Sequence, residues 1–213
     1  MKYEAVIFDL DGVICFTDRY HFLAWKALAD SLNIPFDEKK NDRLRGISRM
    51  ASLDIVLEEY NGPELSEEEK VALATRKNNL YRTYLQSMTT ADLSDEVRDT
   101  LDALRQKGLK LAIGSSSKNT PLILERIGLA GFFDAVSDGN NITRSKPDPQ
   151  VFTMAAEMLG LAPEQCLVVE DAEAGIQAAV SGGFHSAGLG TAADSSLTTY
   201  SLHSFSDLLT STT

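Results

Sequence analysis

The chain has 213 residues, of which 43% are hydrophobic and 24% are charged, and its formal net charge is −11. This composition excludes a disordered chain, and no apolar run is long enough to span a bilayer. The acidic balance argues against a nucleic-acid partner, because phosphates would be repelled by such a surface. The N-terminus shows no secretory signal, so we expect a cytoplasmic protein without a membrane partner.

The first expected element is a buried strand over residues 4–9, which leads directly into two acids. Asp9 and Asp11 are two positions apart, so both side chains leave the carboxyl end of the strand on the same side. Open α/β sheets bind their ligands at this edge. Two carboxylates this close repel each other, and a bound hard cation such as Mg²⁺ or a shared proton relieves the repulsion. An isolated motif of this kind could equally be a strand that runs into a turn.

A long stretch without a strand pattern follows. Residues 18–86 show helical periodicity, and the first and second expected strands are separated by roughly 100 residues, far more than an ordinary connection. We therefore expect an all-helical cap domain over residues 17–87, inserted into an α/β core made of residues 1–16 and 88–213. The cap would hang over the acidic loop, with hinges at residues 16–18 and about 87–92.

Beyond residue 88, apolar runs alternate with helical patterns. The expected strands are Leu109–Ile113, Ala135–Val136, Cys166–Val169 and His185–Leu189. The expected helices are Asp95–Lys107, Thr120–Ile127, Pro149–Leu159 and Ala172–Val180, each ended by a glycine at 108, 128, 160 or 182. Such alternation predicts an α/β fold with a doubly wound, Rossmann-like parallel sheet.

Three further polar motifs lie at the expected strand ends or in loops at that edge. The run Ser115–Asn119 offers hydroxyls, backbone N–H groups and a helix N-terminus to a phosphate, although a helix cap has the same composition. Lys146, between Ser145 and Pro147, could neutralise a phosphate or be an ordinary surface lysine. Glu170 and Asp171 end another apolar run and could supply further magnesium ligands.

In this order the motifs resemble the haloacid dehalogenase-like superfamily. The resemblance rests on Asp9-Leu10-Asp11-Gly12, Ser115, Lys146 and Glu170-Asp171, and it covers essentially the whole chain, helical cap included. Within the superfamily, the beta-phosphoglucomutase family is the most similar, through segments 20–29, 44–49, 76–78 and 115–119. Two positions depart from its pattern: Phe16 stands where an acid is common before the hinge Thr17, and Arg45 stands where lysine is frequent.

This resemblance implies an isomerase that interconverts beta-D-glucose 1-phosphate and glucose 6-phosphate through a beta-glucose 1,6-bisphosphate, so the partner is a small phosphorylated sugar. Asp9 would be the nucleophile and Asp11 the general acid and base. The cofactor Mg²⁺ would be held by the Asp9 side chain, the Asp11 backbone carbonyl and one or both of Glu170 and Asp171. The residues that would hold the transferring phosphoryl group are Ser115, Ser116 and Lys146.

The resemblance also implies a distal phosphate site, because a bisphosphorylated sugar must turn around between the two half-reactions. Arg49 is the expected distal clamp, since a guanidinium matches a phosphate bidentately. His21 either packs at the cap interface or couples sugar binding to Asp11, and Trp25 packs or assists closure. The full set of expected substrate-binding residues is His21, Trp25, Gly46, Ile47, Ser48, Arg49, Lys77, Ser117, Lys118 and Asn119.

Three other functions stay open as alternatives. A sugar-phosphate phosphatase would use the same scaffold and differ only in passing the phosphoryl group to water, a choice that depends on cap closure. A signalling receiver domain is disfavoured by the long helical insertion and by two separate acidic strand ends. A catalytically silent binding module is disfavoured by the presence of both Asp9 and Asp11. We expect the protein to be a monomer.

Overall fold

The computed structural model describes residues 2–44 and 47–212. Its central feature is a parallel sheet with the strand order β3-β2-β1-β4-β5-β6. The strands are β1 (Ala5–Phe8), β2 (Lys110–Gly114), β3 (Ala135–Ser137), β4 (Cys166–Glu170), β5 (His185–Gly188) and β6 (Tyr200–Ser201). This arrangement confirms the expected doubly wound α/β class.

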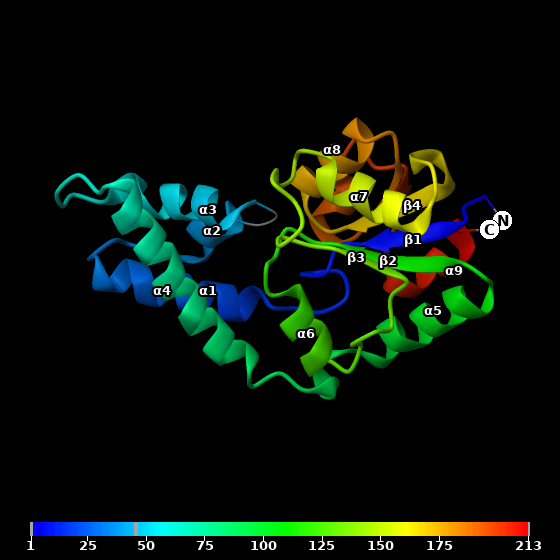
Figure 1. Cartoon of the computed structure of the whole chain (residues 1–213), viewed down its shortest axis with the longest axis horizontal. Coiled ribbons are helices and arrows are strands. Elements are labelled where there is room, and N and C mark those ends of the chain that lie inside the picture. Colours follow the sequence, from blue (N-terminus) through cyan, green and yellow to red (C-terminus); the bar gives the residue numbers. More distant parts are fainter. Residues whose placement is uncertain (1, 45–46, 213) are drawn as a thin grey trace.

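Both faces of the sheet are covered by helices. Alternate residues of β1 enter different apolar clusters, Val6 and Phe8 on one face and Ala5 and Ile7 on the other. Figure 1 shows α7 (Gln150–Leu159) and α8 (Glu173–Ser181) above the sheet. The helices below it are α5 (Asp95–Gln106), α6 (Thr120–Arg126) and α9 (Leu208–Ser211).

The helix boundaries agree with the expected ones to within one or two residues. Gly160 ends α7 in the left-handed conformation, with φ of 72°. At the end of α8, Gly182 is the C-cap as expected; its φ is −85°, and the positive φ of 82° falls on Gly183. The sequence reading also missed β6 and α9, which are too short to show a period.

The position of β1 explains where a ligand can bind. From β1 the chain winds outward through β2 to β3, then crosses back to β4 on the other side of β1 and continues through β5 to β6, so the winding direction reverses between β1 and β4. A crevice forms at the carboxyl end of the strands where the winding direction reverses. Asp9 follows β1 and Ser115 follows β2, while Glu170 is the last residue of β4. The predicted motifs therefore meet at this switch point.

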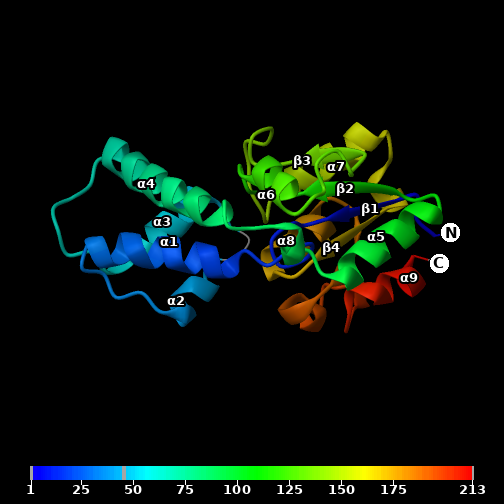
Figure 2. The same cartoon turned by 90° about the horizontal axis from the view of Figure 1, so that it is seen from below.

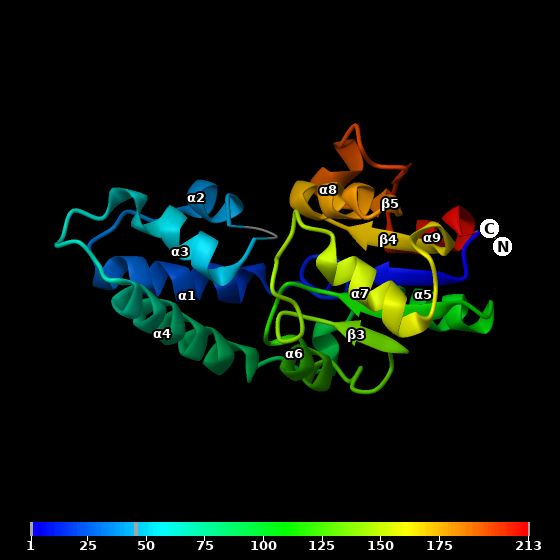
Figure 3. The ribbon, with the colours of Figure 1, turned by 45° about the horizontal axis from the view of Figure 1, so that its top comes forward.

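Four helices form a separate layer beside this edge of the sheet. They are α1 (Asp18–Ser31), α2 (Glu38–Asp42), α3 (Arg49–Val56) and α4 (Glu67–Leu85). Short 3₁₀ helices complete the chain: η1 (Leu57–Glu59), η2 (Thr90–Asp92), η3 (Pro163–Gln165), η4 (Gly190–Asp194) and η5 (Phe205–Asp207). Figures 2 and 3 show α1 to α4 together at the end of the molecule opposite the chain termini.

These helices, which we call the cap, have an apolar cluster of their own. It contains Trp25, Leu28, Ala29, Ile34, Phe36, Leu44, Leu53, Val56 and Ala74. Tyr81 and Leu85, near the end of α4, pack instead with the cluster of the sheet. The domain boundaries at residues 16/17 and 87/88 stay a proposal. Among the described residues, no helix combines the length and apolar character needed to cross a membrane.

The cap cluster makes a quantitative prediction about stability. Leu53 is 0% exposed, whereas Leu23 on α1 is 46% exposed. Leu53→Ala should lower the free energy of unfolding by about 2–5 kcal/mol, because it removes buried methyl groups and leaves a cavity. Leu23→Ala, the matched control, should change it by less than about 0.5 kcal/mol. Urea unfolding measures both, and equal losses would contradict the packing described here.

Candidate active site

A buried lysine joins two carboxylates at the switch point. The Asp9 backbone N–H donates to the Val169 carbonyl at 2.9 Å, which continues the β1–β4 pairing. Lys146 Nζ lies 2.5 Å from Asp9 Oδ1 and 2.5 Å from Glu170 Oε1. Burial alone would lower the pKa of Lys146, but Asp9 and Glu170 outweigh it and raise the pKa above its ordinary value. The lysine is therefore a fixed cation.

Glu170 is held by the start of the next helix as well as by Lys146. Its Oε2 accepts hydrogen bonds from the backbone N–H groups of Asp171 at 2.9 Å and Ala172 at 3.0 Å. Burial raises the pKa of this carboxyl. A Cβ at Gly175 would overlap the Glu170 carboxylate, so the first turn of α8 can approach the acid only with glycine there.

Asp171 is the carboxylate without compensation. Within residues 2–44 and 47–212 its side chain has no hydrogen bond or ion pair. Burial, together with repulsion by Asp9 and Glu170, raises its pKa to about 8. A Cβ at Gly12, whose φ is 92°, would overlap this carboxylate. The structure thus crowds an unpaired acid against two others.

The three acids fit a hard divalent cation. One carboxylate oxygen from each of Asp9, Glu170 and Asp171 lies within 4.8 Å of the others. All the donors are oxygens, which Mg²⁺ prefers, and a cation there would relieve the repulsion that raises the pKa of Asp171. The residues present therefore fit the metal that the motifs predicted.

Asp11 has the properties of a group that exchanges protons near neutral pH. Thr17, which is fully buried, donates a hydrogen bond from Oγ1 to Asp11 Oδ1. Burial, followed by repulsion from Asp9, raises the pKa of Asp11 to about 7. A carboxyl with such a pKa can act both as general acid and as general base.

The loop after β2 presents hydrogen-bond donors beside these acids. The Ser117 N–H donates to Ser115 Oγ at 3.1 Å, and the Asn119 N–H donates to Ser117 Oγ at 3.1 Å. The Ser116 hydroxyl is buried and has no partner among the described residues. Ser115 is 1% exposed, whereas Lys118 is exposed. An anion bound here would meet an unpaired hydroxyl and a lysine.

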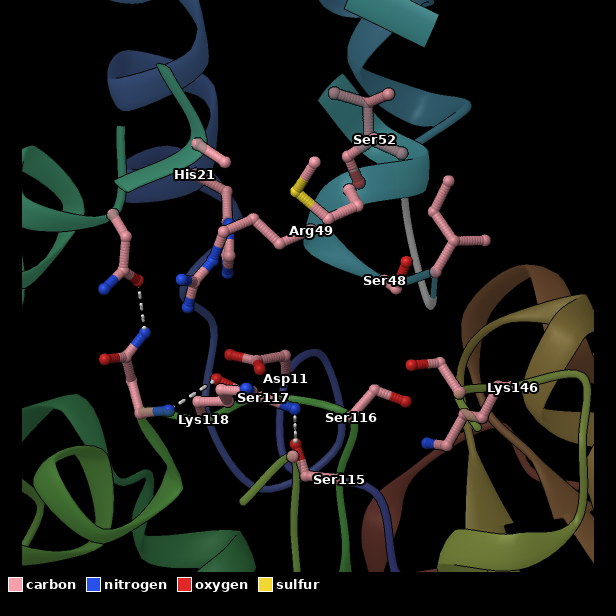
Figure 4. Close-up of a pocket in the computed structure, with 18 of the residues that line it drawn as sticks. Asp11, His21, Ser48, Arg49, Ser52, Ser115, Ser116, Ser117, Lys118 and Lys146 are labelled. Carbon is pink, nitrogen blue, oxygen red and sulfur yellow. Dashed lines mark hydrogen bonds between the residues drawn. The ribbon is translucent and has the colours of Figure 1, made fainter. Parts of the chain in front are cut away.

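On the cap side, the start of α3 directs an arginine into the cavity. Ser48 is the N-cap of α3, and its hydroxyl accepts from the Ala51 N–H at 3.2 Å. Arg49 follows as the first helical residue, and no carboxylate within the described part of the chain pairs with it. Figure 4 shows Arg49 extending from the cap toward Asp11 and Ser117. Burial lowers its pKa, but a guanidinium remains charged.

Lys77 of α4 is buried against aromatic rings beside this arginine. Its Nζ lies 2.9 Å from His21 Nδ1, 4.5 Å from the Trp25 ring centroid and 4.8 Å from that of Tyr81. Burial and the nearby Arg49 lower the pKa of Lys77 to about 7. Burial also lowers the pKa of His21 well below its usual value, which favours the neutral ring.

One cavity of about 550 Å³ lies between the cap and the core. Figure 4 shows Ser48, Arg49 and Ser52 on its cap side and Ser115 to Lys118 on its core side. The predicted residues that line it are Asp9, Asp11, His21, Trp25, Ile47, Ser48, Arg49, Lys77, Ser115, Ser116, Ser117, Lys118, Asn119, Lys146, Glu170 and Asp171. Thr17 is not in the lining but contacts Asp11, while Arg45 and Gly46 lie outside the described residues.

The sequence reading missed several cap residues in the cavity wall. They include Asn41, Leu44, Met50, Ser52, Ala74, Thr75 and Asn78. Helical spacing could have found one of them, because Ser52 lies one turn after Arg49. The others depend on how α2, α3 and α4 pack together, which no local pattern records.

The fold and this site are those of a phosphoryl-transfer enzyme with an acidic strand-end centre, and the comparisons agree. The chain matches the haloacid dehalogenase-like hydrolase family model over residues 3–183, and it belongs to that family. It is 43% identical over 189 residues to a beta-phosphoglucomutase of Bacillus subtilis, and the aligned region covers 88% of this chain and 83% of that enzyme.

Two further relatives carry the names of the two activities considered above, a mutase and a phosphatase. The crystal structure of a beta-phosphoglucomutase from Clostridium difficile superposes with a TM-score of 0.90 at 38% identity, covering 97% of this chain and 93% of that one. A protein named phosphorylated carbohydrates phosphatase, from Thermotoga maritima, is 30% identical over 182 residues, covering 84% of this chain and 82% of that protein. The family resemblance inferred from the motifs is thereby confirmed.

The crowded acids predict how stability depends on pH without metal. The pKa of Asp171 rises from 3.8 to about 8 on folding, so the folded state retains a proton that the unfolded chain releases. In EDTA, stability should therefore fall as the pH rises from about 4 to about 8. Asp171→Asn should reduce this loss of stability by at least ~1 kcal/mol. This lower bound is smaller than the free energy that corresponds to a shift of one pKa unit.

Urea unfolding at pH 5 and pH 8 measures the effect. The exposed Asp194→Asn serves as the control and should leave the pH dependence as in the parent protein. Added Mg²⁺ should raise the stability of the parent at pH 8 and should have little effect on Asp171→Asn. The same pH dependence in parent and Asp171→Asn would contradict the assignment of an uncompensated acid.

Proposed function

We propose that the protein acts as a beta-phosphoglucomutase, interconverting beta-D-glucose 1-phosphate and glucose 6-phosphate. The main support for this proposal is one cavity that has a cationic side chain able to bind a phosphate on each side. Lys146 beside Asp9 lies on the core side, and the unpaired Arg49 lies on the cap side. A bisphosphorylated sugar needs both. The similarity to the Bacillus subtilis and Clostridium difficile enzymes supports the same conclusion.

In the proposed first half-reaction, the phosphoryl group carried on Asp9 passes to the sugar 6-hydroxyl. The hydroxyl oxygen forms a bond to phosphorus as the bond between phosphorus and the Asp9 oxygen breaks, and Asp11 takes the hydroxyl proton. The resulting bisphosphate turns around. Asp9 then attacks the phosphorus on the C1 oxygen, and Asp11 returns its proton to that oxygen, which releases glucose 6-phosphate and restores the aspartyl phosphate.

The geometry supports these roles. A pKa of about 7 lets Asp11 hold or release a proton at neutral pH, and the hydrogen bond from Thr17 orients it. Lys146 contacts Asp9 and so places positive charge beside the nucleophile. Bound Mg²⁺, held by Asp9, Glu170 and Asp171, would neutralise charge on the transferring phosphoryl group.

The alternative is a sugar-phosphate phosphatase, which the Thermotoga maritima relative brings into consideration. Phosphorus NMR distinguishes the two directly. Purified protein with Mg²⁺, beta-glucose 1-phosphate and a trace of the bisphosphate should yield glucose 6-phosphate without accumulating inorganic phosphate. Stoichiometric release of inorganic phosphate would overturn the mutase and establish the phosphatase.

Asp9→Asn tests the nucleophile. An amide cannot form the acyl phosphate, so mutase turnover should be lost, and no phosphorylated protein should be found by intact mass after incubation with the bisphosphate. Asp194→Asn, an exposed substitution of the same kind, should keep full activity. Retained turnover in Asp9→Asn would remove Asp9 from this role.

Arg49→Ala tests the distal phosphate site. A charge-assisted contact to the distal phosphate should be lost, so kcat/KM for the mutase reaction should fall by roughly 10- to 100-fold. Hydrolysis of a small phosphate ester, which has no distal phosphate, should fall much less. Arg43→Ala, a cap arginine that pairs with Glu58 outside the cavity lining, is the matched control. Equal losses in both assays would argue against a distal clamp.

A further inference from the structure

One hydrogen-bonded pair of asparagines links the cap to the core. Asn119, which precedes α6 and is 4% exposed, donates from Nδ2 to Asn78 Oδ1 of cap helix α4 at 2.9 Å. Arg82, one turn further along α4, donates from Nη1 to Asn119 Oδ1 at 3.3 Å. Both ends of the Asn119 amide are therefore bound by the same face of α4.

The chemistry of the three side chains determines which of their atoms donate and which accept hydrogen bonds. Arginine has donors only, so the oxygen of Asn119 must face Arg82 and its NH₂ group must face Asn78. Asn78 then has to present its oxygen to Asn119. This order explains why an acceptor is required at position 78.

The same asparagine is part of the phosphate-binding loop. The Asn119 N–H donates to Ser117 Oγ at 3.1 Å, and the Ser117 N–H donates to Ser115 Oγ at 3.1 Å. A continuous series of hydrogen bonds therefore runs from α4 to Ser115, beside the acids. Lys77 lies next to Asn78 on α4 and contacts His21 within the cap.

We propose that Asn78 is a positioning residue, which acts through Asn119 to hold the phosphate-binding loop in register with the cap. The inference rests on the proposed mutase function. It states that the hydrogen bond between Asn78 and Asn119 helps to decide whether the phosphoryl group is transferred to the sugar or to water. Transfer to a sugar needs the loop and the cap in a fixed relation, because each side holds one phosphate. Hydrolysis needs only water at the aspartyl phosphate, so a loosened cap favours it.

Three variants test the proposal. Asn78→Ala removes the acceptor, whereas Asn78→Asp keeps an acceptor oxygen for Asn119 and for the nearby Arg82. Asn79→Ala is the matched control, because Asn79 is the next residue of the same helix, is exposed and makes no side-chain hydrogen bond among the described residues. The measurement is the ratio of inorganic phosphate to glucose 6-phosphate, followed by phosphorus NMR.

We expect Asn78→Ala to raise this ratio roughly 2- to 10-fold, as the loss of one neutral hydrogen bond would. Asn78→Asp and Asn79→Ala should both stay within about 2-fold of the parent. Equal ratios for Asn78→Ala and Asn79→Ala would overturn the proposal. An equal rise for Asn78→Ala and Asn78→Asp would also overturn it, because the Nδ2 group of Asn78 would then be the important one.

A readout without turnover separates this proposal from the proposed function. The side-chain amide signals of Asn119 in ¹⁵N–¹H spectra should shift in Asn78→Ala and should keep their parental positions in Asn79→Ala. Unchanged signals in Asn78→Ala would disprove the contact. If the parent forms no glucose 6-phosphate at all, the mutase assignment fails, and these spectra still decide whether Asn78 positions Asn119.

Discussion

Excess negative charge at the carboxyl ends of β1 and β4 is the constraint on which the site depends. Asp9, Asp11, Glu170 and Asp171 gather there, and Lys146 is the one cation that ion-pairs with any of them among the described residues. Burial, together with repulsion by Asp9, raises the pKa values of Asp11 and Asp171. A bound cation or a proton would offset this negative charge. The cation and the proton would be taken up by different acids.

This division of labour follows from local structure. Lys146 compensates Asp9 and Glu170 directly, so Asp171 is left to attract a metal ion. Asp11 has no ion-pair partner among the described residues, and burial together with repulsion by Asp9 raises its pKa to about 7, although the hydrogen bond from Thr17 acts in the opposite direction. In the proposed function, a nucleophile, a metal ligand and a proton carrier would thus arise from similar side chains through different neighbours.

The cap contributes the opposite imbalance. Burial, together with repulsion by the nearby Arg49, lowers the pKa of Lys77 to about 7. Two mutually repelling cations face the cavity on one side, and crowded carboxylates face it on the other. A phosphate at Arg49 would restore full charge to Lys77, and a metal ion with a phosphoryl group would neutralise the acids. In the proposed function, a sugar that carries two phosphates would balance the charge on both sides of the cavity.

The sequence predicted the parts of this arrangement that depend on strand ends. The motifs at Asp9, Ser115 and Glu170 could be placed because an apolar run directs the residues after it to one known edge. The sequence did not predict β6, because a strand of two residues is too short to show an alternating pattern. Nor did it find Asn41 or Ala74 in the cavity wall, because which face of a cap helix meets the core is decided by packing between helices.

Helix α4 contacts both the cap and the core through neighbouring residues. Lys77 and Asn78 are consecutive, so their side chains point about 100° apart around the helix axis. Lys77 is hydrogen-bonded to His21 within the cap, while Asn78 is bonded to Asn119 of the core. Because the helix is rigid, a rotation of α4 would alter both contacts together. If the proposed function holds, a change at the cap side of the cavity would therefore reach the loop after β2 through this single helix.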